Sequence, residues 1–402
     1  MSSLGSRHKV SKWCLVSMAS IPLVMTLGNS MLIPILPKIE KILHISAFQS
    51  SLIITVYSIA SIFLIPVAGY LSDQFGRKKI MVPSLLLVII GGFISSFAAW
   101  RLSEPFTVIL IGRVIQGIGA AGAAPIVLPL VGDLYSNEEE ASYCLGIIET
   151  SNTFGKVLSP ILGSLLFSLI WFFPFFSISI FSLISLFMVV KFIKTPTQKE
   201  SSLPFKAFFS KTKEILIREW RWLLVIFIIG IYLMFVLFAV LFYFSKILEE
   251  QYHYEGIIKG FILAVPLLFL CIASLLSGRK IKDSAKKMKA IIMIGLFLIS
   301  ISSAFLWKAD QFFLQLLLLS IAGVGFGSLL PALDALITEF IEKEERGIIT
   351  SFYSSARFIG VAVGPPMMSI AITKSFDLIF LLFGVMGIIL LLSSLLWIKV
   401  QT

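Results

Sequence analysis

The sequence predicts an all-α membrane protein with twelve transmembrane helices in two pseudo-symmetric six-helix bundles. Of the 402 residues, 58% are hydrophobic and only 14% are charged, which leaves too little polar surface to cover a water-soluble particle of this size. Apolar runs that can cross a hydrocarbon core of about 30 Å as a helix recur along the whole chain. The two halves of the chain also repeat one spacing of glycines and prolines.

The expected spans follow one another with short polar segments between them. They cover residues 13–36, 49–71, 79–100, 106–133, 141–167, 170–191, 221–246, 256–277, 288–307, 310–338, 347–372 and 376–399. The first span follows Arg7, Lys9 and Lys12, as the apolar part of a signal peptide would, but no small-residue cleavage site comes after it. We therefore expect it to remain as a transmembrane helix.

The net charge of +11 reflects membrane topology rather than affinity for nucleic acid. When the amino terminus is placed in the cytoplasm, 23 of the 30 Lys and Arg residues outside the spans fall on the cytoplasmic side. Cytoplasmic loops of membrane proteins carry such an excess of positive charge. The distribution predicts a multi-pass protein of the cell (inner or plasma) membrane with both termini in the cytoplasm.

An internal repeat divides the chain. Four small or helix-bending residues recur at a constant offset of 206 residues: Gly117, Gly119, Pro125 and Pro160 match Gly323, Gly325, Pro331 and Pro366. Such six-plus-six repeats place a substrate site between two bundles near the bilayer midplane.

The longest polar stretch separates the first six spans from the last six. We predict an N-terminal six-helix bundle over residues 1–191, a cytoplasmic linker over 192–220 and a C-terminal six-helix bundle over 221–402. The later part of the linker, residues 205–218, mixes basic and apolar residues, so either an interfacial amphipathic helix or a plain solvated segment fits it.

A charged run with two glycines joins the second and third spans. Gly69 and Gly76 permit a tight turn and close helix approach. Asp73 and Arg77 stand four residues apart, where opposite charges can pair across one helical turn. An ordinary positive-inside loop would explain the basic residues, but it would not explain the glycines or the acid.

The fourth span carries a charge inside the membrane. Arg113 lies about five residues into the span, where a guanidinium costs at least about 2.5 kcal/mol. We expect it to face the bundle interior and to pair there, although snorkelling to the outer surface is an alternative. Gly117 and Gly119 follow it and permit close helix packing.

Four further charges fall within the spans. Glu149 lies about 12 Å deep in the fifth span, and Lys156 follows two turns later on much the same face. Asp334 lies near the inner end of the tenth span and Arg357 near the middle of the eleventh, so this pair could meet in one conformation and separate in another. Acids within membranes usually mark ion or substrate paths, whereas a structural salt bridge is the simpler alternative.

Two of these motifs resemble the major facilitator superfamily of transporters. The loop that begins at Gly69 matches the signature loop of that family almost position for position. The run from Arg113 to Gly119 is similar to runs in its proton-coupled members, in which the arginine is associated with proton coupling.

Two more motifs resemble the drug exporters within that family. Gly155, Ser159, Pro160 and Gly163 follow the spacing of the antiporter motif in the fifth span, where small residues pack closely and the proline bends the helix. Ser159 stands where that motif has a glycine. The first span adds a run with Asn29 that is similar to the first helix of the same exporters. The chain thus resembles, over nearly its whole length, the twelve-helix drug:proton antiporters of bacteria.

The resemblance implies proton-coupled export of small amphipathic compounds, cationic or neutral, by alternating access, that is, multidrug efflux. Glu149, Asp334 and Arg113 are the expected proton-coupling residues, with Lys156, Arg357 and Asn29 as secondary candidates. The expected partners are the small-molecule substrate, protons and membrane lipid, and the protein is expected to be a monomer. The alternatives are export of one dedicated metabolite, lipid or metallophore, or nutrient uptake, against which the motif in the fifth span argues.

The family resemblance also implies an inner gate latch. Asp133 ends the fourth span at the cytoplasmic face, beside the turn that carries Asp73 and Arg77. Facilitator transporters brace one conformation with a similar cluster. We therefore expect these three residues to pair.

Catalysis, metals and cofactors are not expected. The three histidines have no metal-ligand spacing, and the three cysteines fall inside spans as packing residues. Gly155 and Lys156 lack the further glycine and the hydroxyl of a phosphate-binding loop. A lipid-modifying enzyme would need clustered His, Asp or Glu at a membrane face, and the loop acids 138–140 have no such partner. We therefore expect an ion gradient, rather than nucleotide hydrolysis, to supply the energy for transport.

Overall fold

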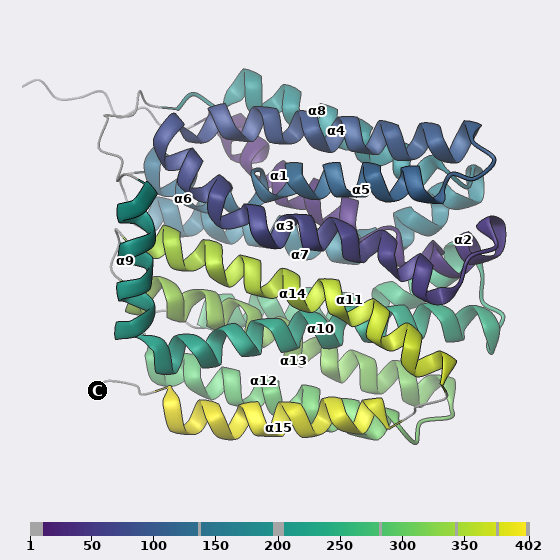
Figure 1. The fold of residues 1–402 in the computed structure, drawn as a ribbon. Helices are drawn as coiled ribbons and strands as arrows, with labels where there is room; N and C mark the ends of the chain where they lie inside the picture. The colour runs from purple at the N-terminus through teal and green to yellow at the C-terminus, as the bar shows by residue number, and fades with distance from the viewer. Residues whose placement is uncertain are drawn as a thin grey trace, which may run out of the picture.

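The computed structural model describes residues 11–135, 138–195, 205–280, 284–341, 345–374 and 378–398, which are helical throughout apart from short turns and loops. The elements are α1 (Lys12–Ser30), the 3-10 helix η1 (Ile33–Ile35), α2 (Leu36–Leu43), α3 (Ala47–Phe75), α4 (Arg77–Arg101), α5 (Phe106–Ala121), α6 (Ala124–Leu134), α7 (Glu138–Leu169), α8 (Phe173–Phe192), α9 (Phe205–Arg218), α10 (Trp220–Glu250), α11 (Gly256–Lys280), α12 (Ala285–Leu306), α13 (Phe312–Phe340), α14 (Arg346–Thr373) and α15 (Ile379–Trp397). Figure 1 shows the long helices side by side, with α2 at one end of the molecule and α9 across the other. We call these the α2 end and the α9 end.

Within the described ranges, eleven helical segments are long and apolar enough to cross a membrane. The first is built from α1, η1 and α2, and the fourth from α5 and α6. The expected span that is missing from these eleven is the fifth in chain order, which corresponds to α7. This helix is 32 residues long but less apolar, because Glu149, Asn152 and Lys156 lie within it. It packs between α1 and α11, so it belongs to the helical array in spite of its polarity.

Helix packing repeats between the two halves of the chain. In the first half α1 packs on α7, α3 on α5 and α4 on α8, and in the second half α10 packs on α14, α11 on α13 and α12 on α15. The halves meet where α3 lies on α14 and α7 lies on α11. The predicted pair of pseudo-symmetric six-helix bundles is therefore confirmed.

The repeated glycines have equivalent packing roles. A Cβ atom on Gly117 would overlap the backbone carbonyl of Tyr57 in α3, and a Cβ atom on Gly323 would overlap the carbonyl of Pro266 in α11. Close approach of the backbones is thus a physical reason for the shared spacing of small residues.

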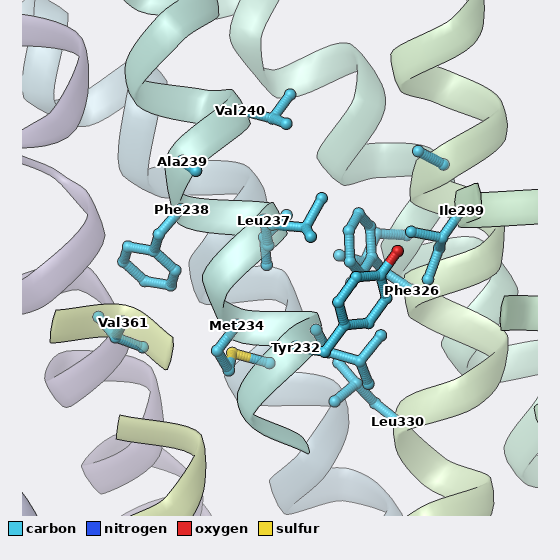
Figure 2. Packing of buried hydrophobic residues seen from close by; sticks show 14 of the residues in the cluster. Tyr232, Met234, Leu237, Phe238, Ala239, Val240, Ile299, Phe326, Leu330 and Val361 are labelled. Carbon is cyan, nitrogen blue, oxygen red and sulfur yellow. The ribbon is translucent and has the colours of Figure 1, made fainter. Parts of the chain in front are cut away.

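Helix α10 forms the centre of the C-terminal bundle. Figure 2 shows its buried side chains between α14 on one side and Ile299, Phe326 and Leu330 on the other. The buried hydroxyl of Tyr232 donates to the carbonyl of Phe383 at 2.9 Å. On the α14 side, a Cβ atom on Gly230 would come within 2.7 Å of the ring of Tyr353. The tight packing of α10 thus sets the position of α14.

The end of the linker is helical. Residues Phe205–Arg218 form α9, which lies across the ends of the long helices (Figure 1). Arg218 of α9 bonds Glu345 at 2.6 Å, just before α14 begins. Residues 196–204 lie outside the described part of the chain, so the bounds of the three predicted units stay a prediction. Residues 1–10 and 399–402 lie outside it too, and the side of the membrane that the termini occupy also stays a prediction.

Candidate substrate and proton site

The expected latch residues lie together at the α9 end. Arg77, at the start of α4, forms ion pairs with Asp73 in α3 and, at 3.0 Å, with Asp133 in α6. Its guanidinium also donates to Ser72 Oγ at 2.7 Å. Gly76 makes the turn with φ at 101°, a left-handed value that side chains disfavour. All of these residues belong to the N-terminal bundle, and a gating role for the cluster stays a prediction.

Gly69 lies where the two bundles meet. A Cβ atom there would lie 3.5 Å from Cβ of Ser351 in α14, which is ordinary contact. The close approach of α3 to α14 at this point therefore does not by itself require glycine.

Arg113 lies in the interior of the N-terminal bundle with no exposed surface. It packs over the ring of Tyr57 at 4.5 Å. Its guanidinium donates to the carbonyls of Ile53 and Gly28 at 2.9 Å, to Gln116 Oε1 at 2.8 Å and to Asn29 Oδ1 at 3.4 Å. These acceptors are all uncharged, so their dipoles and the ring of Tyr57 stabilise the Arg113 cation. The hydrogen bonds also join α1, α3 and α5. Its role in proton coupling stays a prediction.

The small residues of α7 fit that helix against α1. A Cβ atom on Gly163 would overlap the carbonyl of Met31, and one on Gly155 would lie 3.2 Å from Leu23. The buried hydroxyl of Ser159 donates to the Gly155 carbonyl at 2.7 Å within α7, so the serine fits where the antiporter motif has a glycine.

The opposite side of α7 lies against the C-terminal bundle. A Cβ atom on Gly260 of α11 would overlap the carbonyl of Pro160 and would lie 3.0 Å from Ser164 Oγ. Helix α7 therefore packs closely on both bundles, and its polar residues lie near the boundary between them.

The charged residues of α7, α13 and α14 gather near this boundary. Arg357 and Asp334 form an ion pair at 3.8 Å. The carboxylate of Glu149 accepts from Asn152 Nδ2 at 3.2 and 3.4 Å, and Asn152 Oδ1 accepts from Thr26 Oγ1 at 2.5 Å. The structure thus brings together the pair that we expected to meet in one conformation, and it adds Asn152 and Thr26, which the sequence did not point to.

Lys156 lies in the same group without a bonding partner. It is 8% exposed, and it interacts electrostatically with Arg357, Glu149 and Asp334. Among the described residues its Nζ atom has no hydrogen-bond partner, and the same holds for the buried hydroxyl of Tyr353. The structural salt bridge between Glu149 and Lys156 that we considered is not formed among these residues. We call the five residues Glu149, Lys156, Asp334, Tyr353 and Arg357 the central cluster.

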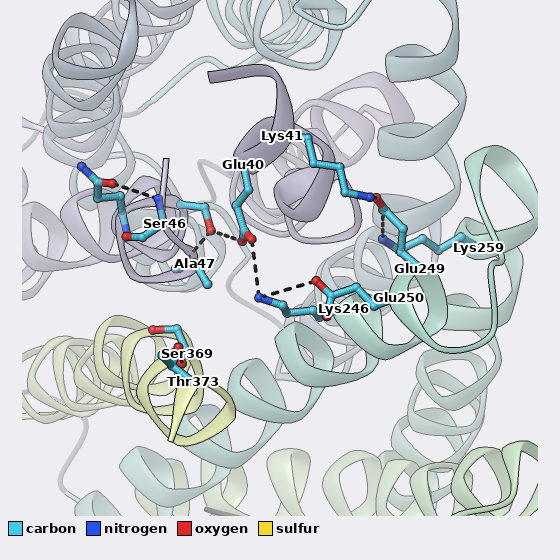
Figure 3. A network of polar contacts seen from close by, with 12 residues as sticks. Glu40, Lys41, Ser46, Ala47, Lys246, Glu249, Glu250, Lys259, Ser369 and Thr373 are labelled. Carbon is cyan, nitrogen blue, oxygen red and sulfur yellow. Dashed lines mark hydrogen bonds and ion pairs between the residues drawn. The ribbon is translucent and has the colours of Figure 1, made fainter. Parts of the chain in front are cut away.

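A second ionic network closes the α2 end, and the sequence analysis missed it. Glu249 of α10 is 1% exposed at its side chain and accepts from Lys259 of α11, which is 2% exposed, at 3.0 Å. Lys41 of α2 donates to the same carboxylate at 2.8 Å from the other bundle. Figure 3 shows both ammonium groups at this carboxylate. Glu249 therefore joins the two bundles through a buried charge.

Two more ion pairs cross between the bundles at this end. Lys246 lies 3.6 Å from Glu40 (Figure 3). Lys38 bonds Glu255 at 2.8 Å, and this hydrogen bond holds the pKa of the Glu255 carboxyl below its usual range. Every ion pair that joins the two bundles within the described part of the chain lies at the α2 end. That end is closed, whereas the Asp334 side chain in the central cluster is 37% exposed.

No group of three or more His, Cys, Asp or Glu residues that could hold a metal ion occurs in the described ranges. The described site contains Lys, Arg, Tyr and carboxylate groups on two bundles. Such groups can bind a polar compound and exchange protons between two conformations.

The fold and the charges within its spans define a membrane transporter built from two bundles, and the chain belongs to the Major Facilitator Superfamily, whose family model matches residues 18–365 and 287–402. The chain is 49% identical to the bacillibactin exporter of Bacillus subtilis (strain 168) over 369 residues, which are 92% of each protein. It is 24% identical to multidrug resistance protein 2 of the same organism over 380 residues, again 92% of each. The structure of a human organic anion transporter matches the fold with a TM-score of 0.77 at 16% identity, over 95% of this chain and 99% of that one.

Proposed function

We propose that this protein exports a metallophore, with bacillibactin as the first candidate, in exchange for protons. The 49% identity to the bacillibactin exporter over 92% of both chains carries the proposal. Our main expectation from the sequence was multidrug efflux, and the multidrug relative is only 24% identical. The comparison therefore favours dedicated export, which the sequence analysis kept as an alternative.

The closed α2 end supports a transport cycle by alternating access. In the predicted topology this end faces outward, and the pairs from Lys38, Lys41 and Lys246 hold the bundles together there. The central cluster lies nearer the α9 end, and Asp334 within it is partly exposed. This arrangement fits a conformation that takes its cargo from the cytoplasm and must break the ion pairs at the α2 end to release it.

Glu149 and Asp334 are the proposed proton carriers. A carboxyl group can be neutral where burial disfavours its charge and can release the proton where water or a cation reaches it. Arg357 lies beside Asp334 at 3.8 Å within the C-terminal bundle, and Asn152 lies beside Glu149 at 3.2 Å within α7. Lys156 of α7 interacts electrostatically with Asp334 and Arg357 across the boundary, so movement of the bundles would change the charges that surround the acids.

Purified protein in liposomes with an imposed pH gradient tests the function. We expect bacillibactin to accumulate against its concentration gradient when the pH gradient is present, and not when an ionophore removes it. Ethidium serves as the multidrug probe in parallel vesicles. Gradient-driven accumulation of ethidium without bacillibactin would favour multidrug efflux, and movement of bacillibactin that ignores the gradient would contradict proton exchange.

A further inference from the structure

We propose that a cavity at the α9 end binds a phospholipid with an anionic headgroup. The cavity has a volume of about 830 Å³ and lies where the junction of α9 and α10 meets the ends of α13 and α15. In the predicted topology this end faces the cytoplasm, so the cavity would lie at the inner surface of the membrane. The proposal concerns lipid rather than cargo, and it does not depend on which compound the protein transports.

The position of the cavity separates it from a cargo site. Among the described residues, its walls come from α9, from the helices α10, α13 and α15 of the C-terminal bundle, and from single residues next to these helices. The cargo site of a two-bundle transporter lies between the bundles near the bilayer midplane. A cavity at the ends of the helices of one bundle instead has the position of a lipid headgroup.

Most of the lining is apolar and exposed. Trp220 and Trp397 are both exposed, and their rings meet edge to face with centroids 5.8 Å apart. Tryptophan is enriched at the membrane–water interface, where its ring contacts apolar groups and its N–H group reaches the polar layer. Leu396, which lines the cavity, continues an exposed stripe along α15 with Leu382 and Ile389 at a seven-residue spacing. An acyl chain that follows this stripe would have its headgroup at the cavity.

Arg221 supplies a charge for the headgroup. It is exposed and lies 5.6 Å from the centroid of the Trp220 ring, and it forms no hydrogen bond or ion pair within the described residues. The acid of the cavity already has partners, because Glu219 accepts from Arg218 at 3.3 Å and from Trp222 Nε1 at 2.7 Å. The planar guanidinium of an arginine matches the geometry of a phosphate group. The cavity therefore offers an unpaired cation beside an apolar wall.

The aromatic pair recurs in the other bundle, but the arginine does not. Trp13 stacks on Phe192 with centroids 5.4 Å apart, at the start of α1 and the end of α8. The residue after Trp13 is the buried Cys14, whereas the residue after Trp220 is Arg221. An aromatic pair can thus join the first and last helices of a bundle without a cation beside it, so helix packing does not explain Arg221.

Helix α9 has the pattern of a helix at a membrane surface. Ile215 is buried, whereas Ile217, which lines the cavity, is exposed. Amphipathic helices with apolar and basic residues bind in the interfacial layer of a membrane. Lys213 of α9 is exposed and would add to the attraction of an anionic lipid. A phospholipid in the cavity would contact both α9 and α15 and would hold the linker helix on the C-terminal bundle.

Native mass spectrometry of the purified full-length protein in detergent is the first test. We expect the first molecule of dioleoylphosphatidylglycerol to bind about fivefold more tightly than dioleoylphosphatidylcholine, because its headgroup carries a net negative charge to Arg221. Arg221→Gln should remove this preference. Arg101→Gln is the matched control and should keep it, because Arg101 lies over the Trp100 ring at 4.0 Å but at the opposite end of the helices. Equal binding of the two lipids, or an unchanged preference in Arg221→Gln, would overturn the proposal.

A second set of measurements tests the apolar wall and the source of the phosphate group. Trp397→Ala should weaken the binding of both lipids to a similar extent and leave the preference for phosphatidylglycerol intact. Unchanged binding of both lipids in this variant would show that the acyl chains lie elsewhere. Inorganic phosphate at millimolar concentration should not displace phosphatidylglycerol. Displacement would show that the cavity takes a soluble phosphate compound, and it would overturn the lipid as its occupant.

Cross-linking locates the bound lipid. Phosphatidylglycerol with a photoactivatable group on its headgroup should label residues 217–222 or 396–398, which line the cavity, and Arg221→Gln should reduce this labelling. Labelling confined to other segments would overturn the proposal. Failure of bacillibactin transport would leave these results unchanged, so the proposed function and the lipid site can fail separately.

Discussion

The α2 end and the central cluster each bury a lysine, and they treat it differently. At the α2 end Lys259 is 2% exposed and bonded to Glu249, which also accepts from Lys41 across the bundles. In the central cluster Lys156 is 8% exposed and has no hydrogen-bond partner within the described residues. The first arrangement is complete without a ligand and holds two bundles together. The second leaves the ammonium group within electrostatic range of Glu149, Asp334 and Arg357 rather than bonded to one of them.

Arg113 shows that burial alone does not separate these cases. It is as deeply buried as Lys259, but it is satisfied by carbonyl and amide oxygens and by the ring of Tyr57. The bonding partners of a buried cation, rather than its depth, therefore distinguish Arg113 and Lys259 from Lys156.

The largest effect should follow from removal of the carboxylate at the α2 end. Glu249→Ala leaves Lys259 buried without its partner, and breaking such a pair costs about 3–5 kcal/mol. The matched control is Glu250→Ala, because Glu250 pairs with Lys246 at a side chain that is 48% exposed, where a pair contributes about 0–1 kcal/mol. Thermal unfolding of the two purified variants measures the difference. Equal losses would mean that the α2 end is not held by the buried charge.

Neutral variants of the two proposed proton carriers should come next. Glu149→Gln and Asp334→Asn should lower gradient-driven accumulation more than about tenfold, because acids within a span usually serve ion transfer. Counterflow exchange without a gradient should persist, which shows that the protein is folded. Glu140→Gln, at an exposed position near the start of α7, is the control. If both variants still respond fully to the gradient, the acids are structural and the protons are carried elsewhere.

A smaller effect is expected from the latch at the α9 end. Arg77→Ala removes the pairs with Asp73 and Asp133, and loss of about 1 kcal/mol from one conformation changes populations roughly fivefold. Transport should fall by a similar factor, as it should in Asp73→Asn, while the exposed Lys79→Ala stays near normal. Fluorescence labels on the two bundles would report the population change. Full transport by both latch variants would mean that the cluster only determines membrane topology and has no gating role.

The smallest effect distinguishes the two buried tyrosines. Tyr232→Phe loses the hydrogen bond to the Phe383 carbonyl, which is worth about 1 kcal/mol of unfolding free energy. Tyr353→Phe removes a hydroxyl that has no partner within the described residues, so stability should change by less than about 0.5 kcal/mol. Denaturation in detergent measures both. A loss in Tyr353→Phe as large as that in Tyr232→Phe would show that its hydroxyl is already bonded in the ligand-free protein.

The sequence predicted the fold and the local clusters because both depend on short-range patterns. Apolar runs determine spans, the offset of 206 residues predicts the repeat, and the four-residue spacing of Asp73 and Arg77 predicts their ion pair. The α7 span was harder to recognise by hydropathy, because the polar residues that make it a candidate site also lower its apolarity.

The partners of the buried charges could not be predicted, because they depend on how the bundles meet. Lys41 and Glu249 are 208 residues apart, and no local pattern links them. Tyr353 stands one helical turn before Arg357, but only the placed neighbouring helices show that its hydroxyl has no hydrogen-bond partner among the described residues. In the same way, nothing in the sequence separates the satisfied Arg113 from the unsatisfied Lys156.

The repeat of packing residues is not matched by a repeat of charges. Gly117 and Gly323 occupy equivalent positions, but the position equivalent to Lys156 is Ala362, and the position equivalent to Tyr353 is Ile147. A site on an axis of perfect two-fold symmetry would bind an asymmetric molecule equally well in two orientations. Because the charges and hydroxyls break that symmetry, a molecule bound between the bundles would meet different groups on its two sides, and one orientation would be preferred.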